Sequence, residues 1–156
     1  MYVAGLTAYP TGAWVVQQAR NRSYELVQRA RPVTFLIRDR DTKFTAGFDE
    51  VLCSEGIGAI RTPIRAPRAN AFAERFVGTL HRECLDPMLI LGRSHLEAVV
   101  HEYVEHYNGH RPHRSLGQLP PQSNRAPPAV LKNVDPSRFK RSDRIGGLVH
   151  EYHLVA

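Results

Sequence analysis

The sequence predicts a mixed α/β fold in which helices are layered on a small sheet. Short β-prone segments alternate along the chain with stretches whose apolar residues recur at helical spacing. The clearest β signal is the apolar run at residues 33–37, which is rich in β-branched and aromatic residues and too short for a helix. Alternation of strands and helices is typical of layered α/β architectures.

The first half of the chain is predicted to hold the sheet. Thr11 is a suitable helix N-cap, and Pro32 ends the helical pattern that follows it. The expected elements are a β-prone segment at 2–8, a helix at 12–30, a buried strand at 33–37, a helix at about 47–54 and a strand at 59–62.

Two further helices are predicted in the second half. One covers residues 71–85, with Asn70 as a possible N-cap and with an apolar stripe that recurs every four residues. The stripe comprises Phe72, Phe76, Leu80 and Cys84. The other helix starts at the capping box of residues 94–97 and ends at Asn108-Gly109. Its apolar positions include Tyr103 and Tyr107, which we expect in the core.

The rest of the chain has a different composition. Residues 111–128 are rich in proline, which predicts an irregular, semi-rigid segment. A basic tail follows and ends in a β-prone stretch, residues 148–155. We expect a folded core over residues 1–125 and a basic C-terminal tail over 126–156.

The composition favours a polyanionic partner. The 156 residues carry a net charge of +6, and only three of the 21 basic residues are lysine. Guanidinium groups pair well with phosphate oxygens, although a merely soluble basic protein would have the same net charge. Two cysteines without a CxxC motif predict a reduced, cytoplasmic setting, and no apolar run is long enough for a membrane span.

Two carboxylates are candidates for a site. Asp39 follows the predicted buried strand, and functional side chains gather at the carboxyl ends of strands in open α/β folds. Glu74 is the only acidic residue in the window 60–82, which also holds five arginines. Either carboxylate could simply pair with a neighbouring arginine. Alternatively, both could bind a divalent cation, because Mg²⁺ and Mn²⁺ prefer carboxylate oxygen.

Three ordered motifs carry a family resemblance: IRDRDTKF, then GIGAIRTPIRAPRANAFAERFVGTLHREC, then HYNGHRPHRSLGQLPP. Together with the closing KRSDRIGGLVHEY, they resemble the integrase core of bacterial insertion-sequence transposases, which are relatives of the retroviral integrases. The resemblance implies an RNase H-like fold and an Asp-Asp-Glu triad on two Mg²⁺ or Mn²⁺ ions. It also implies phosphoryl transfer on DNA, in which one strand is hydrolysed and the freed 3′ hydroxyl attacks target DNA.

By this resemblance, Asp39 corresponds to the second aspartate of the triad and Glu74 to its glutamate, with Asp41 secondary. The residues expected to contact DNA are Lys43, Arg65, Arg68, Arg75, His81 and Arg82. The expected partners are transposon ends and target DNA at the nucleoid, with a second copy or a full-length transposase as a possible protein partner.

The first aspartate of the family's triad has no counterpart in this sequence. Before Arg38 the only carboxylate is Glu25, within the predicted helix, so no residue corresponds to the first aspartate. We therefore expect an incomplete, amino-truncated core without its first strands and with impaired strand transfer. One alternative is an inactive remnant that binds either DNA or a full-length transposase subunit without catalysis. Another is a metal nuclease of the same fold with a different third ligand.

The histidines of residues 101–113 do not fit a metalloprotease helix. The stretch HEYVEH places His101 and His106 five positions apart, whereas that motif needs a spacing of four. A zinc site within this stretch is not expected. The HRPHR stretch at 110–114 could contact nucleic-acid backbone.

Overall fold

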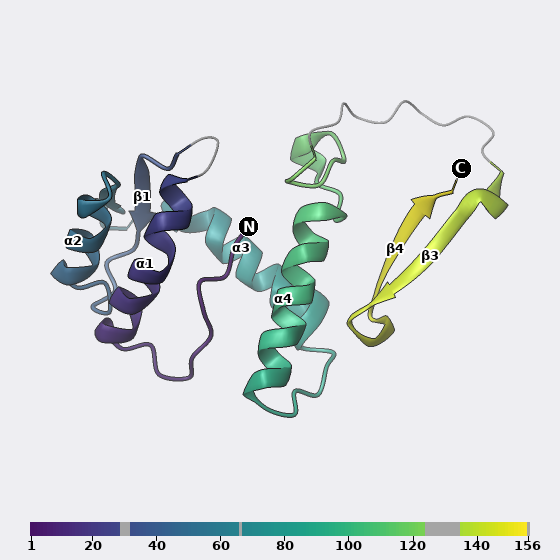
Figure 1. Ribbon diagram of the computed structural model, residues 1–156, viewed down its shortest axis with the longest axis horizontal. Helices are drawn as coiled ribbons and strands as arrows, with labels where there is room; N and C mark the ends of the chain where they lie inside the picture. The colour runs from purple at the N-terminus through teal and green to yellow at the C-terminus, as the bar shows by residue number, and fades with distance from the viewer. Residues whose placement is uncertain (29–31, 66, 124–134, 156) are drawn as a thin grey trace. The chain divides into compact units, whose positions relative to one another are not determined.

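The computed structural model describes residues 1–28, 32–65, 67–123 and 135–155 (Figure 1). It divides into two compact units, Ala4–Arg75 and Met1–Val3 with Phe76–Ala156, and each is described by itself. Across the described parts of the chain, no helix is both long and apolar enough to cross a membrane. The expected boundary between residues 125 and 126 lies outside the described residues and stays a prediction.

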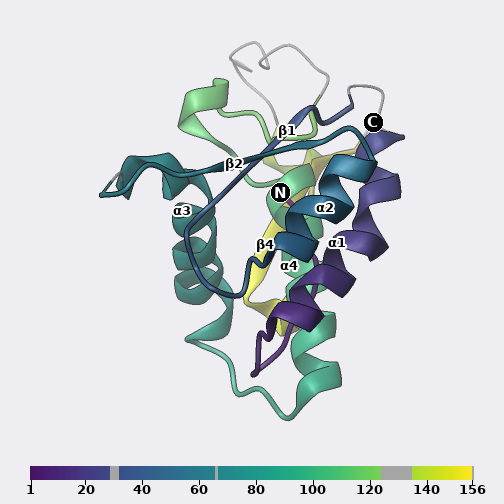
Figure 2. The ribbon, with the colours of Figure 1, turned by 90° about the vertical axis from the view of Figure 1, so that its left-hand side faces the viewer.

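The unit Ala4–Arg75 is built on a strand–helix–strand arrangement. Strands β1 (Phe35–Arg38) and β2 (Gly58–Arg61) pair in parallel, with Phe35 opposite Gly58 and Arg38 opposite Arg61. Helix α2 (Ala46–Ser54) connects them, and α1 (Gly12–Val27) packs beside α2 (Figure 2). The Thr11 hydroxyl accepts a hydrogen bond from the Trp14 amide, which confirms the predicted cap.

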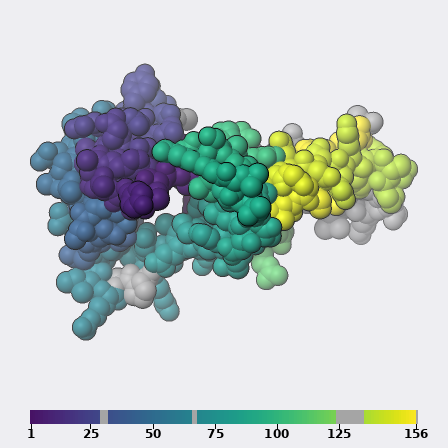
Figure 3. Space-filling view, turned by 90° about the horizontal axis from the view of Figure 1, so that it is seen from below, coloured from purple at the N-terminus to yellow at the C-terminus, as the bar shows by residue number. Residues whose placement is uncertain are grey.

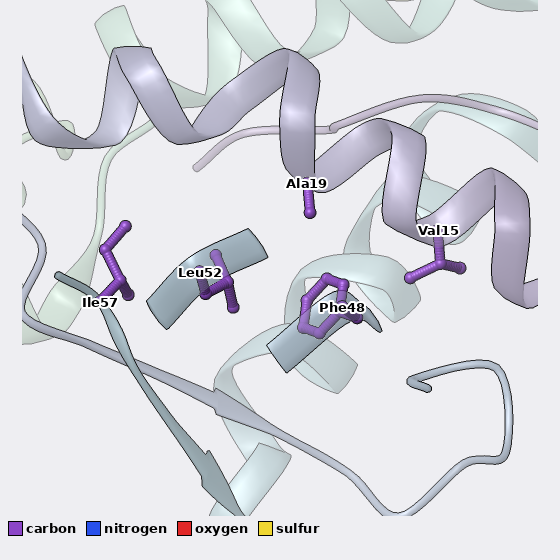
Figure 4. Close-up of a cluster of buried hydrophobic side chains, with 5 residues drawn as sticks. All are labelled: Val15, Ala19, Phe48, Leu52 and Ile57. Carbon is purple, nitrogen blue, oxygen red and sulfur yellow. The ribbon is translucent and has the colours of Figure 1, made fainter. Parts of the chain in front are cut away.

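The core of this unit lies between the two helices and the sheet. Val15 and Ala19 of α1 point toward Phe48 and Leu52 of α2, and Ile57 closes the cluster just before β2 (Figure 4). Leu52 and Ile57 are each only 1% exposed. Full burial of a side chain of this size contributes roughly 1.5–3 kcal/mol, so this cluster fixes the orientation of the strands.

Two predictions about strands need correction. The predicted buried strand at 33–37 is β1, Phe35–Arg38, but Phe35 and Ile37 are 65% and 57% exposed. Successive side chains of a strand point to opposite faces, and the helices cover only the face that carries Leu36 and Arg38. The β-prone segment at 2–8 forms no strand, because it pairs with neither described sheet.

The core of the second unit lies between two helices. Helix α3 (Ala71–Leu80) starts in the first unit and runs into a π-helical turn, His81–Leu85, while α4 spans Arg93–Gly109. The Phe76 and Tyr107 rings meet edge to face with centroids 5.0 Å apart. Tyr103 and Cys84 are fully buried, and burial raises the pKa of the Cys84 thiol to about 11. The expectation that Tyr103 and Tyr107 are core residues is confirmed.

Three details differ from the predictions for these helices. Phe72 is 81% exposed, so the buried stripe of α3 begins at Phe76, where the second unit begins. Asn70 ends a 3₁₀ turn, Pro67–Asn70, and no hydrogen bond from its side chain to α3 is found within the described residues. Helix α4 starts at Arg93 after Gly92 without a side-chain cap, and Glu97 binds Arg93 instead of closing a capping box.

The C-terminal segment folds as a hairpin. Strands β3 (Phe139–Arg144) and β4 (Val149–Leu154) pair antiparallel, with Arg144 opposite Val149. The expected β-prone stretch is confirmed as β4, whereas β3 was not predicted from its basic sequence. The Ile145 amide donates to Glu102 of α4 over 3.0 Å, and the hairpin borders directly on that helix (Figure 3).

Candidate metal and DNA-binding site

Arg38, the last residue of β1, has a structural role. Its side chain is buried, and its guanidinium donates two hydrogen bonds to the Asp49 carboxylate, of 2.8 and 2.6 Å. Arg61, on the neighbouring strand, adds a contact to Asp49 at 3.3 Å. The hydrogen bonds from Arg38 are the main reason why the pKa of Asp49 lies below its usual value.

Asp39 follows directly, and its carboxylate forms no ion pair with any residue that the structure describes. It is half-buried, and its Oδ1 accepts a 3.0 Å hydrogen bond from the Asp41 amide, which closes a tight turn. Asp41 is already paired, because its carboxylate binds the Lys43 ammonium at 2.6 Å. The sequence left open that Asp39 pairs with a neighbouring arginine, but within the described residues its side chain forms no ion pair with Arg38 or Arg40. Arg40 donates to the Thr62 carbonyl instead.

Glu74 lies in the first turn of α3 and is exposed. Within the described residues its side chain makes no hydrogen bond or ion pair. The chain that leads to it leaves β2 at Thr62, whose amide donates to the Arg38 carbonyl over 2.8 Å. Because β1 and β2 are parallel, this chain departs from the same edge of the sheet as Asp39. Asp39 and Glu74 both lie in the unit Ala4–Arg75.

The predicted DNA-contacting cations divide into paired and unpaired groups. Arg65, Arg68, Arg75 and Arg82 are exposed and form no ion pair among the described residues. Lys43 is paired with Asp41, and the His81 ring lies 3.4 Å from Asp86. Arg65 to Arg75 belong to the first unit, whereas His81 and Arg82 belong to the second.

The motif HRPHR contains a structural arginine that sequence reasoning missed. Arg111 binds both oxygens of Glu83, at 2.9 and 2.6 Å, and Glu83 also accepts from the buried Tyr103 hydroxyl at 2.7 Å. The ion pair lowers the pKa of Glu83, while burial and this hydrogen bond raise the pKa of Tyr103. Arg111 therefore ties the end of α4 to the turn after α3.

Asp39 and Glu74 are not part of a three-ligand cluster within the described residues. The single carboxylate before Arg38, Glu25, lies on α1 and is bound by Arg22 at 2.8 Å. The one group of three close ligand atoms in the described chain comprises His110, Glu151 and His153. The histidine stretch at 101–113 includes His110, but the sequence did not single out the two residues of β4. The alternation of HEYHLV, which puts Glu151 and His153 on one face of a strand, was the available signal.

Comparisons with known proteins agree with the motif pattern. Residues 55–121 match the family described as integrase core domain, a range that includes Glu74 and its arginines but not Asp39. The chain is similar to the insertion element IS476 uncharacterized 39.2 kDa protein of Xanthomonas euvesicatoria, at 32% identity over 116 residues. That alignment covers 71% of this chain and 31% of the relative.

A second relative is the insertion element IS407 uncharacterized 31.7 kDa protein of Burkholderia multivorans, at 30% identity over 84 residues. This alignment covers 53% of the chain and 30% of the relative. The chain thus spans less than a third of the length of both curated relatives. No solved structure matches it significantly.

Proposed function

We propose that this chain, whose residues 55–121 match the integrase core domain family, acts on DNA in transposition, as its similarity to insertion-element proteins suggests. Asp39 and Glu74 supply two carboxylates of a site for Mg²⁺ or Mn²⁺. Arg65, Arg68 and Arg75 hold the DNA backbone beside them. The observation that carries the proposal is the pairing pattern: Arg38 pairs with Asp49 and Lys43 pairs with Asp41, and within the described residues the Asp39 carboxylate forms no ion pair.

The residues present fit such a cation. Both groups offer carboxylate oxygen, the ligand that Mg²⁺ and Mn²⁺ prefer. Neither is neutralised by a cationic side chain within the described residues, and carboxylates that converge on one point repel each other without positive charge between them. When bound, a pair of such ions activates the attacking hydroxyl and stabilises the leaving oxygen of a phosphodiester.

The protein's own part in this chemistry is to position the two carboxylates and the DNA backbone. Asp39 follows the end of β1, and its carboxylate accepts a hydrogen bond from the Asp41 amide, which orients it. Glu74 stands on a regular helix, which is a rigid support. Guanidinium groups contact phosphate oxygens through paired hydrogen bonds and fix the register of the backbone.

A second function, DNA binding without strand transfer, applies to the 156 residues taken by themselves. The only carboxylate before Arg38 is Glu25, which already binds Arg22. Placement errors near 1 Å can lower a rate about 100-fold, so a site formed by these 156 residues with two carboxylates and no third should be impaired more strongly. A polypeptide of these residues should therefore bind DNA but should not join DNA ends.

The experiment combines binding and joining on one duplex oligonucleotide. Fluorescence anisotropy should show binding that weakens steeply with salt, and a gel assay with Mg²⁺ or Mn²⁺ should show no joined product. The double variant Arg65→Gln/Arg68→Gln should bind more weakly, whereas Arg93→Gln, an exposed arginine on α4, should not. Binding that is insensitive to salt would contradict the DNA-binding role. Joined product that disappears in Asp39→Asn would contradict the second function and support catalysis by these residues alone.

A further inference from the structure

Three imidazoles surround one buried carboxylate in the second unit. The Glu151 side chain is 1% exposed, and its Oε1 lies 3.1 Å from Nδ1 of His106. Its other oxygen, Oε2, lies 3.5 Å from Nε2 of His110 and 3.8 Å from Nε2 of His153. The His110 and His153 rings meet edge to face with centroids 5.2 Å apart.

Regular secondary structure places each of these groups. His106 lies on the last turns of α4, and His110 follows the end of that helix. Glu151 and His153 are two residues apart on β4, so their side chains point to the same face of the hairpin. The hydrogen bond from Ile145 to Glu102 and the burial of Ile145 hold the hairpin against α4.

The distances around Oε2 fit a shared cation better than hydrogen bonds. The separations of 3.5 and 3.8 Å exceed the normal range for an N–H···O bond. Ligands at about 2.0–2.1 Å from a tetrahedral zinc ion are about 3.3–3.5 Å apart. All three ligand atoms lie within 4.8 Å of one another, so a small closing movement is enough. We propose that His110, Glu151 and His153 bind Zn²⁺.

The donor set selects the metal. Two imidazole nitrogens and one carboxylate suit Zn²⁺ and related transition metals, whereas Mg²⁺ prefers oxygen ligands and water. Three protein ligands leave a fourth position for water or another group. His106 acts as a positioning residue, because its contact with Oε1 directs Oε2 toward the other two histidines.

Arg144 competes with the cation for the same oxygen. Its Nε lies 3.1 Å from Oε2 of Glu151, and its side chain is 42% exposed, so it can turn into solvent. Removal of this guanidinium frees the oxygen and removes a positive charge beside the site. The site should therefore bind Zn²⁺ more tightly in Arg144→Gln, an effect opposite to that of losing a ligand.

Zinc at this position would fasten the C-terminal hairpin to the end of α4. The hydrogen bond from the Ile145 amide to Glu102 and the contacts of Glu151 with His106 and His110 link the hairpin to the helix and its C-terminal end. A ligand that binds only the folded arrangement stabilises it by RT ln(1 + [L]/Kd), so the stabilisation grows with the logarithm of the ligand concentration. This role concerns the second unit alone and does not depend on Asp39 or Glu74.

The test uses the full chain, purified without a histidine tag. Isothermal titration calorimetry with Zn²⁺ should show one site per chain, and Co²⁺ should give the visible absorption of a tetrahedral nitrogen–oxygen site. The variants His110→Gln and His153→Gln should each weaken Zn²⁺ affinity at least tenfold. Arg144→Gln should strengthen it several-fold.

Matched controls separate the site from surface histidines. His150, on the same strand, pairs with Asp143, and His101 is exposed on α4. His150→Gln and His101→Gln should leave Zn²⁺ affinity within twofold of the parent chain. Equal losses in the control and ligand variants would contradict the proposal, and so would the absence of a Co²⁺ spectrum. A decrease of affinity in Arg144→Gln would also overturn it, even if a ligand variant failed to fold.

Discussion

The carboxylate of Asp49 accepts two hydrogen bonds from the buried guanidinium of Arg38, over 2.8 and 2.6 Å. This pairing explains why arginine and aspartate alternate at the end of β1, because neighbouring residues there point to different partners. Arg38 is directed inward to helix α2, whereas Asp39 lies at the edge of the sheet and makes no ion pair in the described part of the chain. The structural arginine and the candidate metal ligand are therefore adjacent in sequence but have separate partners.

The pairing makes Asp49 important for stability. Asp49→Asn leaves a buried guanidinium without its counter-charge, and breaking such a pair costs about 3 kcal/mol or more. Urea unfolding monitored by circular dichroism should show this loss in the free energy of unfolding. Glu50→Gln, at an exposed neighbouring position, should change it by less than about 0.5 kcal/mol. Equal effects in the two variants would rule out the structural role of the pair.

The same pair predicts acid sensitivity. Arg38 lowers the pKa of folded Asp49 below its ordinary value of 3.8. As the pH falls, Asp49 is therefore protonated in the unfolded chain before it is protonated in the folded chain. The pair stabilises the fold fully at pH values above 3.8, and this contribution is lost as the pH falls below that value. Urea midpoints measured from pH 6 down to pH 2 should fall less steeply below about pH 4 in Asp49→Asn than in the parent chain. Parallel curves would show that the pair does not contribute.

In the second unit, the Tyr103 hydroxyl should contribute a measurable hydrogen bond. Tyr103 is fully buried and donates to Glu83 over 2.7 Å, whereas the Tyr107 hydroxyl has no described hydrogen bond. Tyr103→Phe should lower the free energy of unfolding by about 1 kcal/mol. Tyr107→Phe is the matched control and should be close to neutral. A larger effect of the control would indicate that ring packing, not the hydrogen bond, determines stability here.

DNA affinity should depend on the unpaired arginines. Each phosphate contact contributes a slope of about −0.9 to the dependence of log affinity on log salt concentration. Arg68→Gln should therefore make the slope shallower by about one contact, and by a similar amount for unrelated DNA sequences. Arg61→Gln, whose guanidinium already binds Asp49, should leave the slope unchanged. The reverse ranking would show that pairing does not decide which arginines contact DNA.

Local patterns in the sequence predicted those features that depend only on nearby residues, such as helix caps and the apolar spacing of one helix or strand. The cap at Thr11, the buried face of α4 and strand β4 are of this kind, because each depends on residues close together in the chain. The exposure of Phe35 and Phe72 could not be predicted, because it depends on which elements cover a face. The same holds for the Arg38–Asp49 and Arg111–Glu83 pairs, and for the cluster around Glu151, which joins segments about 40 residues apart.

The central claim is that Asp39 and Glu74 bind the same divalent cation, and a Mn²⁺ titration followed by electron paramagnetic resonance tests it most directly. Asp39→Asn and Glu74→Gln should each weaken Mn²⁺ affinity about tenfold or more, and the double variant should lose little beyond either single one, because ligands of one ion are coupled. His153→Gln should have no effect, since Mn²⁺ favours oxygen ligands. Unchanged affinity in both single variants, or independent losses that add fully, would contradict the shared site.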